Sequence, residues 1–133
     1  MEKKLRLLVA TADRPHFQGE AGSVTLPGED GELGVLPDHA PLVGLLGAGE
    51  VRIARAEGPV SFFVAGGFFR VLKNEVTILA DEVAPLDTLD IAEAEAKFVA
   101  ARALPAATEA ERRAAAAAAR YARARLRCAR KRR

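Results

Sequence analysis

The hydrophobic pattern of this 133-residue chain changes its period once, near Asp87, and this change limits the possible folds more than any other feature. Before Asp87, short apolar runs alternate with turn residues, whereas after it apolar residues recur every three or four positions. The first pattern is typical of β-strands and the second of α-helices. The sequence therefore predicts a β + α chain, with an all-β domain at residues 1–87 and an α-helical domain at residues 88–133.

The first domain holds six runs rich in Val, Ile, Leu, Phe and Thr, which predict strands. They cover residues 5–11, 23–26, 50–56, 60–65, 68–72 and 75–80. Lys73 and Asn74 lie between the last two runs and predict a hairpin turn, because Asn tolerates a positive φ. No helical pattern separates the runs, so an antiparallel sandwich or barrel is expected.

The second domain predicts two helices joined by a short loop, which make an antiparallel helical hairpin. For the first helix we expect Thr88 as N-cap, Pro105 as terminator and an apolar stripe of Leu89, Ala92, Ala96, Val99 and Ala103. Thr108 and Glu111 form a capping box at the start of the second helix. Its stripe is expected to contain Ala110, Ala114, Ala117, Tyr121, Ala124 and Cys128.

Alanine supplies 18 of the 46 residues after Asp87, so the apolar faces of both helices are shallow. A buried methyl group contributes about 0.8 kcal/mol, against roughly 1.5–3 kcal/mol for a Leu or Phe side chain. The hairpin should therefore form helix readily but dock weakly, which would allow it to move.

Charge is divided unequally along the chain. Residues 1–87 hold 8 Lys and Arg against 13 Asp and Glu, whereas residues 88–133 hold 12 against 5. Five arginines are predicted to share one face of the second helix: Arg113, Arg120, Arg123, Arg127 and Arg130. This arginine face is either a solvated surface or a surface for an acidic partner, which could be nucleic acid or protein.

The residues that could catalyse a reaction or bind a metal lack the spacing along the sequence that either role requires. Glu29, Asp30 and Glu32 lack the spacing of a cation-binding loop, and His16 and His39 have no Cys, Ser or second His at catalytic or ligand spacing. Cys128 falls on the second helical stripe and is expected to be a packing residue. We therefore expect no enzyme, no metal and no cofactor. A signal peptide is not evident, which predicts an intracellular protein.

The segment LPGEDGELGVLPDHAPL, residues 26–42, concentrates prolines, glycines and acids between two apolar runs. Its central part GELGVLPDHAP is followed in order by GAGEVRI, by the paired glycines of FFVAGGFFRV and by VTILADEV. Together these segments resemble the epsilon subunit of F-type ATP synthases, which is called delta in mitochondria. The resemblance runs from about Leu5 to Asp90, and the helical hairpin continues it.

The resemblance implies a ten-stranded β-sandwich, a two-helix C-terminal domain and a non-catalytic place at the foot of the rotating central stalk. It implies that residues 26–42 form a rigid docking loop, whose Glu29, Asp30 and Glu32 meet basic loop residues of the c-ring. By the same resemblance, Thr11 and His39 face the gamma subunit. The location implied is peripheral, at the cytoplasmic face of a bacterial inner membrane.

The resemblance also implies a regulatory role for the helices. In the family they extend into the catalytic head, where basic residues meet the alpha and beta subunits and block ATP hydrolysis. Some bacterial members bind ATP through an I/L-D-x-x-R-A motif, and here Leu89 to Ala94 place Glu93 where that motif has Arg. Asp90, Arg120 and Arg123 would hold the nucleotide, but the carboxylate of Glu93 should repel its phosphates, so weak ATP binding or none is expected.

The competing interpretation is a nucleic-acid-binding module that uses the arginine-rich helix. The acidic first domain and the specific docking segment argue against nucleic acid as a partner.

Overall fold

The computed structural model describes residues 3–131. Contacts within the chain divide it into two compact units, Met1–Pro85 and Leu86–Arg133. The boundary predicted from the sequence lies two residues further along, because the short turn at Leu86–Thr88 belongs to the second unit.

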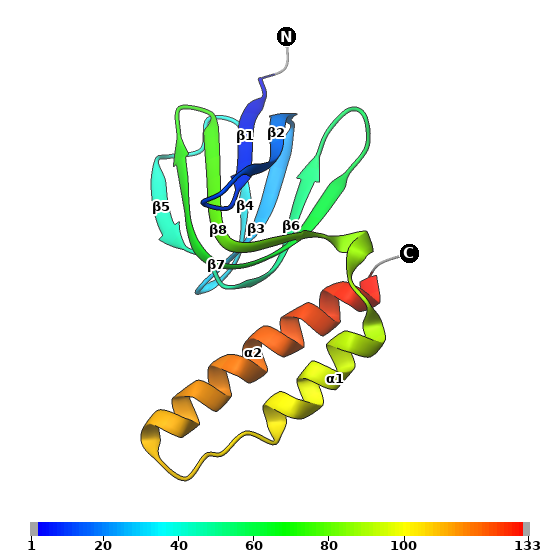
Figure 1. Cartoon of the computed structure of the whole chain (residues 1–133). Helices are drawn as coiled ribbons and strands as arrows, with labels where there is room; N and C mark the ends of the chain where they lie inside the picture. Colours follow the sequence, from blue (N-terminus) through cyan, green and yellow to red (C-terminus); the bar gives the residue numbers. More distant parts are fainter. Residues whose placement is uncertain (1–2, 132–133) are drawn as a thin grey trace. The chain divides into compact units, whose positions relative to one another are not determined.

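The first unit is a sheet of eight strands (Figure 1). Their bounds are β1 (Leu5–Ala10), β2 (Pro15–Ala21), β3 (Ser23–Gly28), β4 (Gly31–Val35), β5 (Leu42–Leu45), β6 (Ala48–Ala54), β7 (Val60–Leu72) and β8 (Glu75–Pro85). The strand order is β2-β1-β8-β7-β6-β3-β4, and β5 pairs with β7. Neighbouring strands are antiparallel except β1 and β8, which run parallel. A hairpin turn would force two strands to be antiparallel, but β1 and β8 are far apart in the sequence and no hairpin joins them.

Two long strands turn this sheet into a sandwich. Residues 60–65 of β7 pair with β6, whereas residues 68–71 pair with β5, and only the first part of β8 pairs with β1. Gly66 and Gly67 lie between the two parts of β7 with φ of 70° and 98°. The predicted sandwich is confirmed, and counting the two parts of β7 and β8 separately gives the ten strands that the resemblance implies.

The predicted strands differ from the observed ones in two ways. The runs at 60–65 and 68–72 are one strand, β7, because its two glycines bend the strand without ending it. The strands β2, β4 and β5 were not predicted, since they are polar or glycine-containing and bury few side chains. The turn at Lys73 and Asn74 is confirmed, with φ of 51° and 63°.

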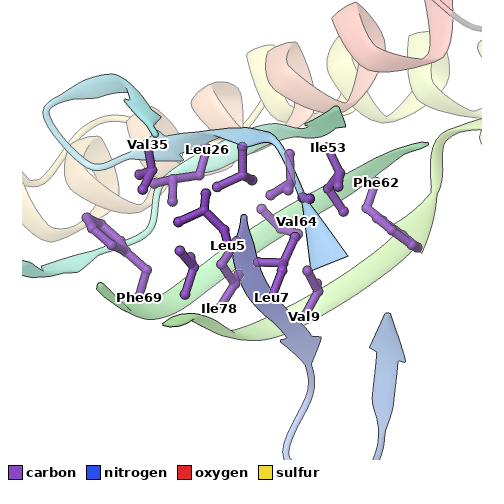
Figure 2. Close-up of a cluster of buried hydrophobic side chains, with 14 of the residues drawn as sticks. Leu5, Leu7, Val9, Leu26, Val35, Ile53, Phe62, Val64, Phe69 and Ile78 are labelled. Carbon is purple, nitrogen blue, oxygen red and sulfur yellow. The ribbon is translucent and has the colours of Figure 1, made fainter. Parts of the chain in front are cut away.

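The core of the first unit is entirely apolar (Figure 2). Alternation in β1 buries Leu5, Leu7 and Val9 against side chains from both layers. The same period buries Val51 and Ile53 in β6 and Val76 and Ile78 in β8. Burial of each such side chain stabilises the fold by roughly 1.5–3 kcal/mol, so this cluster holds the two layers together.

The second unit contains a 3₁₀ turn, η1 (Leu86–Thr88), followed by α1 (Ile91–Arg102) and α2 (Glu109–Lys131), which pack against each other. The capping box is confirmed, because Glu111 N donates to Thr108 Oγ1 (3.0 Å) and Thr108 N donates to Glu111 Oε1 (2.9 Å). The expected N-cap at Thr88 is wrong. Thr88 lies in η1, and Asp90 caps α1 by accepting from Ala92 N (2.9 Å).

The predicted helix stripes are only partly correct. In α1, Ala94 and Ala101 are buried and Phe98 is half-buried, whereas the expected Ala92, Ala96 and Val99 are exposed. In α2, Ala124 and Cys128 are buried as expected, but the exposed positions include Ala110, Ala114 and Ala117. Alanine occurs on every side of these helices, so the apolar pattern of the sequence does not identify which side is buried.

Gly67 should be the residue whose replacement harms the sandwich most. A Cβ at this position would overlap the carbonyl oxygen of Leu79, and the φ of 98° disfavours any L side chain. We expect Gly67→Ala to lower the free energy of unfolding by about 2 kcal/mol or more, measured by calorimetry. The control is Gly34→Ala, whose Cβ would meet no atom within 4 Å. Equal melting of the two variants would contradict this account of the bend.

Candidate functional site

The three acids of the predicted docking loop lie at the tip of the β3–β4 hairpin. Glu29 and Asp30 form its turn, Glu32 follows in β4, and all three are exposed. The turn is tied to its surroundings by backbone bonds, because Glu29 N donates to Leu45 O and Gly47 N donates to Pro27 O, both at 2.9 Å. The acids are therefore presented on a fixed backbone.

Glu32 is already engaged within the sandwich. Arg52 of β6 lies 3.3 Å from Glu32 and 3.4 Å from Glu50, so one guanidinium serves two carboxylates. Glu29 and Asp30 form no ion pair with any residue of the described chain. Sequence reasoning missed Arg52, although its position between the buried Val51 and Ile53 indicated that it points outward.

A hollow of about 440 Å³ lies beside this acidic turn. It is lined by the turn, by the start of β4, by β5 and by Phe69. The side chains of Val43 and Leu45 in β5 are 68% and 58% exposed, which is unusual for large apolar groups. Sequence reasoning missed this hollow, since the pairing of β5 with β7 creates it.

The loop that carries His39 is held by a small polar network. Lys3 forms an ion pair with Asp38 (2.7 Å), and Asp38 N donates to Asn74 Oδ1 (2.6 Å) in the β7–β8 turn. Hydrogen bonds from Lys3 and Asn74 hold the pKa of Asp38 below its ordinary value. His39 is half-buried and its Nδ1 donates to the carbonyl oxygen of Ala40 (2.7 Å).

Thr11 lies at the other end of β1, in the turn before β2. Its hydroxyl donates to Asp13, which lowers the pKa of that carboxyl, and its Oγ1 is 2.9 Å from His16 Nε2. The structure does not bring Thr11 and His39 together. The exposed Phe68 is paired across strands with Leu45 and Leu79, and Leu79 is paired with Ala10, the neighbour of Thr11.

The arginine face of α2 is exposed at all five predicted positions. Arg113 pairs with Glu109 (3.5 Å), and the guanidinium of Arg123 lies 5.8 Å from the ring centre of Phe98. Arg120, Arg127 and Arg130 have no ion-pair partner between residues 3 and 131. The free charge of this face is therefore smaller than five arginines imply.

The residues expected at a nucleotide site have different local contacts. Asp90 is used as the cap of α1, and Glu93 lies 3.4 Å from Lys97 and 3.5 Å from Arg125 of α2. Arg123 instead lines a basic hollow with Phe98, Leu126, Arg127, Arg130 and Lys131, whereas Arg120 does not. Phe98, which lies between Arg102 and Arg123, and Arg125 were both missed from the sequence.

Other candidate groups have structural roles. Cys128 is buried, as its packing role requires, and His16 is a turn contact. Among the described residues, no three His, Cys, Asp or Glu side chains gather as a metal ion would require. Within residues 3–131, no helix is long and apolar enough to cross a bilayer.

Comparison with known proteins gives a consistent result. Residues 4–85 match the family model described as ATP synthase, Delta/Epsilon chain, beta-sandwich domain. An ATP synthase epsilon chain of Rhodopirellula baltica is 39% identical over 126 residues, covering 95% of this chain and 98% of the relative. The epsilon chain of Bordetella petrii is 48% identical over 99 residues, covering 74% of this chain and 67% of the relative.

Solved structures agree with the sequence relatives. A chain in the OSCP/F1/c-ring structure of the Euglena gracilis mitochondrial ATP synthase has a TM-score of 0.81 and 25% identity, covering 90% of this chain and 78% of its own. A chain from the central stalk/c-ring structure of the Tetrahymena thermophila enzyme has a TM-score of 0.70 at 16% identity, covering 96% and 98%. The second likeness shows the fold alone.

The network around Asp38 should stabilise its loop only when the carboxyl is ionised. Because the folded-state pKa is lowered, this contribution is present above the unfolded value near 3.9 and is lost as the pH falls through the folded pKa. We expect Asp38→Asn to speed amide exchange in residues 36–41 at neutral pH but not below the folded pKa. Asp30→Asn is the control, and equal effects of both variants would contradict this role.

Proposed function

The chain belongs to the delta/epsilon chain family of ATP synthases, and on that premise we propose that it is a rotor subunit of the central stalk. The observation that carries the proposal is the alignment with an epsilon chain over 95% of this sequence, since it includes both the sandwich and the helices. Epsilon chains are non-catalytic, so the subunit acts by contact. We place it at the cytoplasmic face of a bacterial inner membrane, as a peripheral component of the complex.

The sandwich is proposed to hold two partners at once. Glu29, Asp30 and Glu32 face basic loops of the c-ring, and Thr11 and His39 mark the side that binds the gamma subunit. The exposed Phe68, which lies in one cross-strand row with Leu79 and Ala10 beside Thr11, supports this second assignment, because exposed apolar groups mark protein interfaces. The fixed backbone of the acidic turn supports the first, because little ordering entropy is lost on docking.

The helices are proposed to restrain ATP hydrolysis by entering the acidic regions of the alpha and beta subunits. Isolated surface ion pairs contribute little, but arginines that become partly desolvated in an enclosed acidic cleft contribute more. The small buried side chains of the hairpin support this proposal, since little packing free energy is lost when the two helices separate.

Removal of the helices should separate the two roles. Truncation after Asp87 is expected to leave the sandwich bound to gamma while ATP hydrolysis by the reconstituted head rises several-fold at low salt. Changing Arg113, Arg120, Arg123, Arg127 and Arg130 together to alanine should reproduce most of the rise, whereas Arg112→Ala should not, because Arg112 already pairs with Glu109.

Each part of this proposal can fail separately. A full-length chain that does not bind gamma would contradict the rotor role. Equal hydrolysis with full-length and truncated protein would contradict inhibition, and inhibition that high salt does not weaken would exclude the arginine mechanism.

ATP should bind the isolated protein weakly or not at all. Glu93 places a carboxylate in the motif and already pairs with Arg125, whose side chain is only 14% exposed. We expect calorimetry to detect no micromolar binding by the natural protein and at least tenfold tighter binding by Glu93→Arg. Glu95→Arg, on the same helix but outside the motif, is the control. Micromolar binding by the natural protein would contradict the prediction.

A further inference from the structure

We propose that the ion pair between Glu93 of α1 and Arg125 of α2 is a latch, which keeps the two helices together and thereby limits their inhibitory action. This inference rests on the proposed restraint of ATP hydrolysis by the helices and adds a means of regulating it. It gives a conformational role to Arg125, which lies outside the arginine face.

The ion pair crosses the interface between the two helices. Arg125 Nη2 lies 3.5 Å from Glu93 Oε1, and the same oxygen lies 3.4 Å from Lys97 Nζ, one turn further along α1. Lys97 belongs to the same helix as Glu93, so their contact does not depend on where α2 lies. Separation of the helices breaks only the contact with Arg125, and this contact therefore distinguishes the closed hairpin from an open one.

Arg125 differs from the arginine face of α2 in position and in exposure. An α-helix turns by about 100° per residue, so Arg125 lies nearly opposite Arg123 and Arg127, each two positions away. Those two residues are exposed, whereas the side chain of Arg125 is only 14% exposed. Arg125 is therefore placed to act within the hairpin, while the arginine face points away from it.

The apolar contacts of α1 leave room for one ion pair to decide closure. The buried residues of α1 are Ala94 and Ala101, whose methyl groups contribute little packing free energy. Methyl groups also make no directional contact, so they do not favour one alignment of the helices over another. An ion pair is directional, and it stabilises the closed hairpin in one alignment only.

The two partners do not depend on each other equally. A guanidinium stays charged at physiological pH, so Arg125, which is largely out of water, needs a carboxylate close by. Glu93 is 52% exposed and has Lys97 beside it, so water and Lys97 can stabilise its charge without Arg125. Loss of the carboxylate should therefore open the hairpin more than loss of the guanidinium.

The decisive experiment measures amide hydrogen exchange in α1 of the full-length protein and, with the same variants, ATP hydrolysis by the reconstituted head. Glu93→Gln should speed exchange in α1 about tenfold and leave the sandwich unchanged, because a helix of 12 residues is marginal in water once it is separated. Inhibition of hydrolysis should increase. Glu95→Gln, the same change at an exposed position of α1, is the matched control.

A second variant tests whether Arg125 is the partner that matters. Arg125→Gln removes the cation itself, so it should speed exchange less than Glu93→Gln does. The double variant Glu93→Gln with Arg125→Gln should lie closer to the natural protein than Glu93→Gln alone. A role of Glu93 in helix structure alone would give neither this rescue nor stronger inhibition.

The outcomes separate the latch from the function on which it rests. If Glu93→Gln changes exchange no more than Glu95→Gln, or if Arg125→Gln does not rescue it, the latch is wrong. If exchange follows the expectation and truncation raises hydrolysis, but Glu93→Gln does not increase inhibition, closure does not limit inhibition and the inference is overturned. If exchange follows the expectation but hydrolysis is the same with every variant and with the truncated protein, the helices are latched and the proposed inhibition is wrong.

Discussion

The bend of β7 at Gly66 and Gly67 is the constraint on which the rest of the sandwich depends. It lets one hairpin, β7–β8, belong to both layers, so the layers share two strands and one apolar core. It also decides where β5 attaches, because the residues that pair with β5 begin immediately after the bend. The acidic turn is fixed by a hydrogen bond to β5, and therefore the candidate docking surface depends on two glycines that do not line the hollow.

Internal ion pairs occupy some of the charges that partners would use. Arg52 forms an ion pair with Glu32, Glu109 with Arg113, and Glu93 with Arg125. The first two pairs are exposed and contribute little to stability, but each of the three lowers the charge that a partner meets. Their effect is on specificity: the rim of the hollow offers Glu29 and Asp30, and α2 offers Arg120, Arg127 and Arg130. A count of charges along the sequence cannot reveal this division, because it depends on which side chains the fold brings within reach.

Sequence reasoning succeeded where local chemistry decides the structure. The Thr108–Glu111 capping box and the Lys73-Asn74 turn depend on neighbours a few residues apart, and the change of period near Asp87 separates strands from helices. It failed where distant segments decide. Asp90 rather than Thr88 is the N-cap of α1, because Thr88 belongs to the preceding turn η1. The hollow at β5 exists only because β5 pairs with β7, a strand more than twenty residues further along the chain. The buried face of α1 could not be predicted, since alanine marks no side of a helix.

The uneven distribution of free charge along α2 has a consequence for the proposed inhibition. Near its start, Arg112 and Arg113 both pair with Glu109, and the next turns are alanine. Near its end, Arg127 and Arg130 are exposed without an ion-pair partner among residues 3–131, and they line a basic hollow with Phe98. Long-range electrostatic attraction grows with unpaired charge. An acidic cleft would therefore attract the C-terminal end of α2 first, and the alanine-rich N-terminal part of the helix would enter after it. Small side chains suit that order, because a helix that buries few large groups loses little packing free energy when it leaves its first position.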